Sequence, residues 1–456
     1  MSARPDPTLP GKPRSRLARR AAFAGLMGTF IETYDFAVYA YLVVFTAPLF
    51  FPAENETTAI LASLVVFAAG FVARPLGGIF FGRMGDLRGR RTTLVITVVG
   101  MGLATAALGI IPSYQQIGIA APVLLVLARL VQGFSAGGEI MGAATYVAES
   151  GSPARRGLLS AATPIGAAAG IAFAPAVVGL TTALTSHAAM GAWGWRLPFL
   201  LSLPLTIACL LYRIRLEDTP GFTELAAREE VAKAPVKEVL ARHWKNLLRV
   251  AALAIAINLA GYTLNSYIPL YLQTQVKLPA GTVYWLAAIV LALALPANLL
   301  GGLAVDRFGQ RKVMAVALAC CLVAVYPAIL VMSGAGSSIL AVGAVYWLLV
   351  SCVQAASPPA YAAFVGLFPT RVRYSGAAIG YNIGNIAGGG FAPYLAALLT
   401  ASTGSLHSPA LLIGAAALVG IVTILTSPVS VAGRRSPAVA EAGPSRELRT
   451  DAGRNR

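Results

Sequence analysis

The sequence predicts an all-α membrane protein in which twelve transmembrane helices form two six-helix bundles. Of its 456 residues, 57% are hydrophobic and only 12% are charged, which is about half the charged fraction of a soluble domain. Apolar stretches of roughly 20 residues or more, long enough to span a bilayer, recur along the chain. A polar loop between two of these stretches also occurs a second time, at the same place in the other half of the chain. Together these observations indicate two related bundles in lipid.

The predicted helices fall into two groups of six, separated by a charged stretch at 215–246. In the first half they cover residues 21–51, 57–81, 91–112, 118–148, 157–183 and 194–214. In the second half they cover residues 247–274, 280–304, 312–333, 337–366, 373–400 and 407–429. The predicted domains are an N-terminal arm, the first bundle, a central loop, the second bundle and a tail, at 1–20, 21–214, 215–246, 247–429 and 430–456. The tail lacks spaced apolar residues, so we expect it to be disordered.

Lys and Arg are distributed unevenly about the predicted helices. If the N-terminus is cytoplasmic, the segments on that side hold 31 of the 35 Lys and Arg residues. The predicted outer loops hold Lys277, with Arg196 at a helix edge. Because basic residues are retained on the cytoplasmic side, we expect a multi-pass protein of the cell (plasma or inner) membrane with both termini in the cytoplasm.

The composition also excludes several classes of function. A net charge of +17 does not indicate nucleic-acid binding here, because the basic residues form short clusters between apolar runs and no continuous basic face. The four cysteines (Cys209, Cys320, Cys321 and Cys352) lie inside apolar segments without metal-ligand spacing, and we interpret them as packing residues. No cluster of His, Cys or Asp follows a helix face. We therefore expect no metal, no cofactor and no enzymatic activity.

A ten-residue loop follows the second predicted helix of each half. The first runs from Gly82 to Arg91 and the second from Gly302 to Arg311, and their Gly, Asp, Gly and Arg positions match at a constant offset of 220 residues. The matched residues that we single out are Gly82, Asp86, Gly89, Arg90 and Arg91, and in the second loop Asp306, Gly309 and Arg311. Repeated bundles are typical of secondary transporters, whose two lobes rock about a central site.

The repeated loop resembles the signature loop of the major facilitator superfamily. Within that superfamily, five stretches resemble the metabolite:proton symporter family: Glu32 to Phe36, Arg74 to Gly78, Arg129 to Glu139, Trp193 to Phe199 and Phe368 to Ser375. The likeness covers about residues 20–430 in the expected order. It implies the twelve-helix fold and uptake of a small solute with protons, as in the proline/betaine, α-ketoglutarate, citrate and shikimate permeases.

The sequence departs from the family pattern at four points. The fifth predicted helix begins with small and apolar residues, Leu159 to Gly166, where several members of the family place a bulky or charged group. An aromatic residue is usual where Thr33 lies, and the second loop has Gln310 where the first has Arg90. The tail lacks the coiled coil that some osmosensing relatives carry, which argues against osmosensing.

Five ionisable residues are predicted at membrane depth: Glu32, Asp35, Arg74, Arg129 and Glu139. Such residues are expensive in lipid and are therefore candidates for a functional site. From a rise of about 1.5 Å per residue, we expect two groups. Glu32 and Asp35 should lie with Arg129 near the centre, and Arg74 should lie with Glu139 nearer the inner surface. Tyr39 falls on the same helix face as Asp35.

These charges suggest a proton-coupled site. Burial favours the neutral form of a carboxyl group, and a nearby guanidinium favours the ionised form. We expect Asp35 to carry the proton, with Arg129 as its switch or as the clamp on a substrate carboxylate. The alternative is that these charges only pin helices together.

The family resemblance implies a different role for the loops. Asp86 should hold the facing half at a helix N-terminus, where the helix dipole favours an anion. Arg90 and Arg91 should form ion pairs on the cytoplasmic side, and breaking these contacts would let the lobes rock. The alternative is an ordinary positively charged turn.

The functional hypothesis is symport of a proton with a small polar metabolite, an organic acid or a zwitterion, by alternating access. We expect the chain to work as a monomer in the lipid bilayer, with the substrate and the proton as its partners. One central Arg can hold one carboxylate, whereas a tricarboxylate would require more cations. The alternative within the same fold is proton-driven efflux of a drug-like or secreted metabolite.

Overall fold

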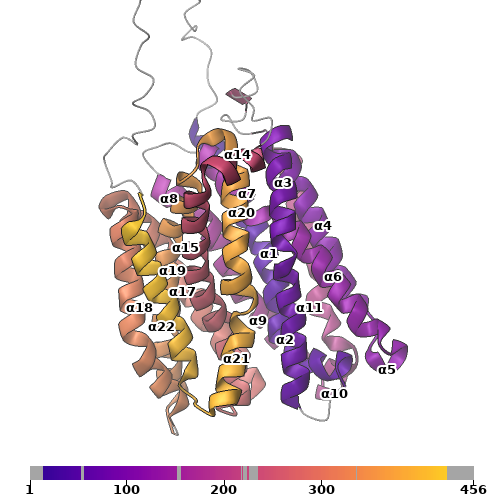
Figure 1. Ribbon diagram of the computed structural model, residues 1–456. Coiled ribbons are helices and arrows are strands. Elements are labelled where there is room, and N and C mark those ends of the chain that lie inside the picture. The colour runs from indigo at the N-terminus through magenta and orange to yellow at the C-terminus, as the bar shows by residue number, and fades with distance from the viewer. Residues whose placement is uncertain are drawn as a thin grey trace, which may run out of the picture.

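Every regular element of the described chain is helical, and twelve helices are long and apolar enough to cross a membrane. The computed structural model describes residues 14–52, 56–150, 156–216, 218, 223–224, 235–334 and 336–428. The two halves of the chain form bundles that lie side by side, indigo to magenta and orange to yellow (Figure 1). The prediction of a twelve-helix all-α membrane fold is confirmed. Helices suit lipid because they satisfy all their backbone hydrogen bonds internally.

The first bundle contains six spans, several of which are broken into shorter helices. Its elements are α1 (Arg14–Phe50), α2 (Glu56–Val72), α3 (Arg74–Arg88), α4 (Arg90–Ile110), α5 (Tyr114–Ile117), α6 (Ala120–Ala136), α7 (Glu139–Ser150), α8 (Arg156–Ser160), α9 (Ala162–Leu184), α10 (His187–Ala189), η2 (Met190–Gly194), α11 (Arg196–Leu200) and α12 (Ser202–Arg213).

The second bundle repeats this plan after a short helix, α14, in the segment predicted as a loop. Its elements are α14 (Pro235–Arg242), α15 (Trp244–Tyr262), η3 (Thr263–Tyr267), α16 (Ile268–Thr274), α17 (Ala280–Phe308), α18 (Gln310–Ser333), α19 (Ile339–Gly366), η4 (Thr370–Val372), α20 (Arg373–Asn385), η5 (Ile386–Gly390), α21 (Ala392–Thr403) and α22 (Ser408–Thr426).

The second span continues beyond its predicted end at residue 81 and reaches Arg88. The glycines of this segment lie within the helix and do not end it. Their role is to let α3 approach the other bundle closely. A Cβ atom on Gly85 would lie 2.1 Å from the ring of Tyr374, and one on Gly78 would lie 2.7 Å from Asn382 Nδ2. Small residues allow close helix packing in membranes, so α3 packs directly on α20.

The contacts between the bundles follow the internal repeat. Helix α3, which ends the second span, packs on α20 of the eleventh span, and α9 of the fifth span packs on α17 of the eighth. In each half, the second and the fifth span therefore contact the facing half. This arrangement leaves the middle of the interface for a site between the two bundles.

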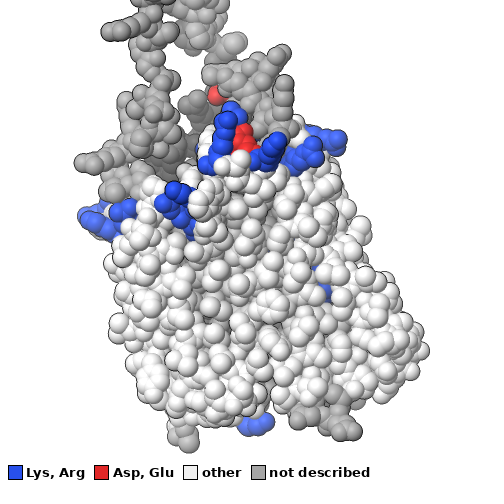
Figure 2. Space-filling view, viewed as in Figure 1, with Lys and Arg blue, Asp and Glu red and all other residues white. Residues whose placement is uncertain are grey.

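Lys and Arg gather at one end of the molecule, the upper end in Figures 1 and 2, where α14 and the two repeated loops lie. We call this the basic end. Below it the visible surface is white apart from isolated blue atoms (Figure 2). This distribution fits an apolar belt in lipid with a charged face at one side.

Some sequence predictions concern residues outside the described ranges. These are the disordered tail at 430–456, most of the N-terminal arm at 1–20 and part of the central loop at 215–246.

Candidate transport site

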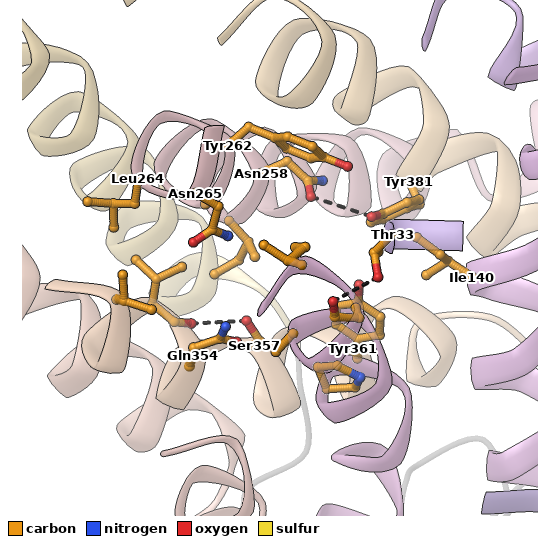
Figure 3. A pocket seen from close by; sticks show the side chains of 18 residues that line it. Thr33, Ile140, Asn258, Tyr262, Leu264, Asn265, Gln354, Ser357, Tyr361 and Tyr381 are labelled. Carbon is orange, nitrogen blue, oxygen red and sulfur yellow. Dashed lines mark hydrogen bonds between the residues drawn. The ribbon is translucent and has the colours of Figure 1, made fainter. Parts of the chain in front are cut away.

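A cavity lies between the two bundles, and the space in it that the centre of a water molecule can occupy is about 70 Å³. Its wall from the first bundle is mostly apolar, whereas the second bundle supplies most of the polar groups (Figure 3). The polar residues that line it are Thr33, Asn258, Tyr262, Asn265, Gln354, Ser357, Tyr361 and Tyr381. None of the described residues that line the cavity carries a charge. A ligand here would meet hydroxyl groups, amides and tyrosine rings.

Local departures from regular helix shape the wall. The π-helical segment η3 interrupts the seventh span and brings Leu264 and Asn265 to the cavity; such segments are frequent at functional sites. On the same span, Asn258 accepts a hydrogen bond from the hydroxyl of Tyr381 at 3.4 Å, while its Nδ2 has no partner among the described residues. This buried amide donor is therefore available to a ligand.

Thr33 reaches the cavity because α9 packs very closely on α1. A Cβ atom on Gly166 would lie 2.2 Å from the backbone oxygen of Leu26, and one on Gly170 would lie 2.1 Å from that of Phe30. At this separation the Thr33 hydroxyl donates to the backbone oxygen of Ala167 at 2.8 Å. The close approach favours a small residue at this position, where the family resemblance led us to expect an aromatic one.

The five predicted membrane charges are all buried, but their pairing differs from the prediction. Arg74 was expected with Glu139, and instead its Nη1 lies 2.8 Å from Glu32 Oε1. The guanidinium of Arg74 also lies over the rings of Phe36 and Phe71, 4.1 and 4.6 Å from their centroids. The error arose because the break at Ala73 begins a new helix, α3, whose first residue is Arg74, and this places the side chain close to α1.

Glu139 pairs with Arg213, a residue that sequence reasoning placed at the edge of the central loop. Arg213 donates to both carboxylate oxygens of Glu139 and to the backbone oxygen of Leu94. Thr97 donates to the same carboxylate at 2.6 Å. A signal was present in the sequence: Arg213 shares a helix face with Thr206 and Cys209, which are also buried.

Asp35 and Arg129 belong to one buried cluster, as predicted, but they are joined through other side chains. Thr105 donates to Asp35 Oδ2 at 2.7 Å and accepts from Gln132 Nε2 at 2.6 Å. Arg129 Nη1 in turn donates to Gln132 Oε1. In the part of the chain that the structure describes, Arg129 forms no ion pair with a carboxylate. Gln132 could have been found from its position three residues after Arg129, whereas nothing local marked Thr105.

Tyr39 contributes its ring to this cluster. The guanidinium of Arg129 lies 3.8 Å from the centroid of that ring, in a cation–π contact. The Tyr39 hydroxyl donates to the backbone oxygen of Ser63 at 3.1 Å. Tyr39 therefore contacts Arg129, whereas the sequence placed it only on the same helix face as Asp35.

The charged cluster lies behind the cavity wall and is coupled to it by aromatic rings. Phe71, which contacts Arg74, packs edge to face on the cavity residue Tyr262 at 5.3 Å. A movement of Arg74 can thus reach Tyr262, which lines the cavity, through the ring of Phe71.

The first repeated loop holds the second bundle at the basic end. Asp86 Oδ2 accepts from the backbone nitrogen of Ser375 at 3.0 Å and from its hydroxyl at 2.7 Å. Ser375 lies in the first turn of α20, so the carboxylate occupies the position that a helix dipole favours. Gly82 allows the approach, because its Cβ would lie 3.1 Å from Ser375 Cα.

Arg90 and Arg91 reinforce this loop in different ways. Arg90 lies 3.2 Å from Asp86 and 3.2 Å from Glu149, and its Nη1 donates to the backbone oxygen of Gly85 at 2.8 Å. Arg91 donates to the backbone oxygen of Ile214 within its own bundle, where an ion pair was expected.

The second repeated loop makes the matching contact in the opposite direction. Asp306 Oδ2 accepts from the backbone nitrogen of Leu158 in α8, at 3.0 Å. Arg311 donates to the backbone oxygen of Ser427 at 2.8 Å. Both loops turn at a glycine with positive φ, Gly89 at 100° and Gly309 at 84°, a conformation that other residues rarely adopt.

Two family models together match most of the chain. The model described as Sugar (and other) transporter matches residues 21–242, and that of the Major Facilitator Superfamily matches residues 251–455. Their boundary falls between the two bundles.

Individual relatives match the chain nearly end to end. The proline/betaine transporter of Escherichia coli (strain K12) is 36% identical over 422 residues, which cover 90% of this chain and 83% of the relative. The glycine betaine/proline/ectoine/pipecolic acid transporter of Dickeya dadantii is 34% identical, with 89% and 82% covered. An inner membrane metabolite transport protein of Escherichia coli (strain K12) is 38% identical, with 84% and 88% covered.

A solved structure has the same fold at low sequence identity. The proton:xylose symporter bound to 6-bromo-6-deoxy-D-glucose superposes with a TM-score of 0.74 at 15% identity, covering 90% of this chain and 95% of that one. With the relatives above, this confirms the resemblance inferred from the motifs. The chain belongs to the major facilitator superfamily and is a multi-pass membrane transporter, not an enzyme.

Proposed function

We propose that this transporter takes up a small zwitterionic solute together with a proton. The observation that carries the proposal is that the two bundles contribute chemically different groups at and behind the interface. The second bundle lines the cavity with neutral polar groups, and the first bundle buries a set of ionisable groups directly behind it. A solute site and a proton site are thus adjacent but separate.

The chemistry of the cavity favours a zwitterion over an organic acid with several carboxylates. Tyrosine rings can hold an ammonium group, and hydroxyl groups and the unpartnered Asn258 amide can donate to one carboxylate. A di- or tricarboxylate would require cationic groups in the wall. Two relatives named above carry betaine and proline in their names, which supports the same class.

Asp35 is proposed as the proton carrier and Arg129 as the group that responds to its charge. Both are fully buried, and Asp35 Oδ1 and Arg129 Nη2 have no hydrogen-bond partner among the described residues. A carboxyl group with an unused oxygen beside an incompletely paired cation can change its protonation without breaking a salt bridge.

The direction and setting of transport complete the proposal. We propose that the basic end faces the cytoplasm, so that both termini lie there, that the chain lies in the inner membrane, and that it works as a monomer with the proton gradient as its energy source and no cofactor. In the present conformation the Asp86 and Asp306 contacts hold the basic end together. Uptake is favoured over the efflux alternative because the relatives are named transporters of proline and betaine, and because the solved structure of the same fold is titled a proton:xylose symporter.

The test is a solute panel in proteoliposomes with an imposed pH gradient. We expect proline or glycine betaine to accumulate, and citrate and α-ketoglutarate not to. Asp35→Asn should abolish gradient-driven accumulation and keep exchange of solute between the two sides. Thr46→Val is the matched control, because Thr46 lies on the same helix and donates to the backbone oxygen of Leu42.

Each arm of the panel addresses one part of the proposal. Accumulation of citrate in place of a zwitterion would contradict the assigned solute class. Full accumulation by Asp35→Asn would contradict the assigned proton carrier.

A further inference from the structure

The hydrogen-bonded chain from Asp35 to Arg129 passes through a single hydroxyl group. Thr105 lies between the carboxylate and Gln132, at 2.7 Å from Asp35 Oδ2 and 2.6 Å from Gln132 Nε2. All four side chains are 0% exposed. Because these side chains are buried, we assign each hydrogen of the series to one bond.

The cation determines how the amide of Gln132 is oriented. A guanidinium can only donate, so the atom that Arg129 contacts must be Gln132 Oε1. The NH₂ group therefore points to Thr105 and occupies one acceptor site of its hydroxyl. The single hydrogen of that hydroxyl remains to be placed.

Thr105 Oγ1 lies within reach of two acceptors for its one hydrogen. One is Asp35 Oδ2 at 2.7 Å, and the other is the backbone oxygen of Met101 at 3.0 Å. When Asp35 is ionised, the bond to its carboxylate is charge-assisted and the stronger of the two. When Oδ2 carries a proton, the carboxyl group donates to Thr105, and the hydroxyl hydrogen must turn to Met101.

We infer that Thr105 is a positioning residue that stabilises the ionised form of Asp35 and relays its protonation to Gln132 and Arg129. The inference rests on the proposed function, since it takes Asp35 as the proton carrier. A proton on Oδ2 reverses the donor in the Asp35–Thr105 bond, and a proton on Oδ1 leaves Thr105 donating to a neutral carboxyl group. In either case Thr105 Oγ1 no longer donates to a charged group. Arg129 is linked to this oxygen through Gln132.

Few other groups can take over this role. The titratable groups that interact electrostatically with Asp35 are Arg129, Glu32 and Tyr34. Glu32 is matched by Arg74, and the Tyr34 hydroxyl donates to the backbone oxygen of Pro198 at 2.7 Å. Of the helices packed on α1, α9 has no charged residue. The charged residues of the others are Arg129 on α6, Glu139 and Glu149 on α7, Arg213 on α12, Arg90 and Arg91 on α4, Arg196 on α11 and Glu56 at the start of α2. Glu139 pairs with Arg213, and Glu149 pairs with Arg90. Thr105 is thus the side chain that donates directly to the Asp35 carboxylate.

The test follows the protonation of Asp35 without requiring a solute. The full-length protein in lipid is titrated with pH while infrared difference spectra record the carbonyl band of protonated carboxyl groups. The part of the band that Asp35→Asn removes belongs to Asp35. We expect Thr105→Val to raise the midpoint of that part by about 1 pH unit, because a hydrogen bond to a charged group changes an equilibrium on the order of tenfold.

Two further variants distinguish the effect of losing the hydroxyl group from a general effect of substitution on the fold. Thr105→Ser keeps the hydroxyl and should restore the native midpoint. Thr93→Val is the matched control, because Thr93 is buried on the same helix and donates to the backbone oxygen of Gly89 at 3.0 Å; its midpoint should stay native. Should Thr105→Val fail to fold, the smaller Thr105→Ala carries the same expectation.

An unchanged midpoint in the hydroxyl-free variant, or an equal shift in Thr93→Val, would overturn the inference. Those results would leave the solute panel untouched. Conversely, a native chain that accumulates no solute would overturn the proposed function while the infrared shift could still be measured.

Discussion

The two bundles share one architecture but bury different chemistry. The first buries eight charged side chains: Glu32, Asp35, Arg74, Asp86, Arg90, Arg129, Glu139 and Arg213. In the described part of the second bundle, no Asp, Glu, Lys or Arg is buried, and amides take their place, as in the bond from Asn298 Nδ2 to Gln354 Oε1 at 2.8 Å. Charge is costly at this depth, so its restriction to one half indicates a specialised role there. The first half holds groups suited to proton coupling, and the second shapes the solute site.

The two repeated loops also differ, and again the loop of the first half makes more charged contacts. Asp86 accepts two hydrogen bonds from Ser375 and is supported by Arg90. Asp306 accepts from the backbone of Leu158, and Gln310, at the position that matches Arg90, has an Oε1 without a partner among the described residues. At the 220-residue offset, Glu149 corresponds to Pro369, so the second loop also lacks the carboxylate that holds Arg90.

The largest effect is expected at the Glu139–Arg213 pair. Replacing Arg213 with Met leaves Glu139 buried with Thr97 as its remaining donor, which should lower stability by about 3–5 kcal/mol. Thermal unfolding in detergent measures this loss. The double variant Arg213→Met with Glu139→Met should recover much of it. A single variant as stable as the native chain would show that this half does not depend on its buried charges.

The second-largest effect is expected at the contacts that Asp86 and Asp306 make between the two bundles at the basic end. Asp86→Asn should weaken its contact by roughly 10- to 100-fold, because hydrogen bonds to a charged group are involved, and Asp306→Asn should have a smaller effect. With the native cysteines replaced, the rate at which a maleimide labels a cysteine at the buried position Ala378 reports opening. Equal labelling in the two variants would contradict the asymmetry.

A smaller effect is expected from the neutral pair of the second half. Asn298→Leu removes the donor to Gln354, and Gln354 can turn to the cavity that it lines. The loss of stability should therefore be about 1 kcal/mol. The measurement is the same thermal unfolding used for Arg213→Met. A loss as large as that of the ion pair would remove the energetic distinction between the halves.

The smallest effect is expected from exchanging the residues that distinguish the loops. Gln310→Arg can contact Asp306 four residues earlier but finds no equivalent of Glu149, so labelling at position 378 should change by less than about twofold, as for an exposed pair. Arg90→Gln, which breaks contacts with Asp86 and Glu149, should increase labelling several-fold. A strong effect of Gln310→Arg would show that an added ion pair with Asp306 is sufficient to strengthen the contact of the second loop.

The number of spans, the two halves and the positions of the turns between them could be predicted from the sequence alone. These follow from local properties, because each apolar stretch is driven into lipid by its own residues and each loop glycine adopts its positive φ within its own turn. The ionisable residues Asp35, Arg129 and Glu139 were likewise visible, since a charge inside an apolar stretch stands out without reference to any other helix.

Which buried groups pair with one another could not be predicted, because it depends on how the helices pack. Arg74 could not be assigned to Glu32, nor Arg213 to Glu139, because a pairing depends on how each helix is rotated and where it breaks, as at Ala73. Thr105 and the tyrosines of the cavity resemble many other residues in the sequence. They acquire a role only when helices far apart in the chain are packed to within hydrogen-bonding distance, and that packing is the sum of many small contacts that no single stretch of sequence contains.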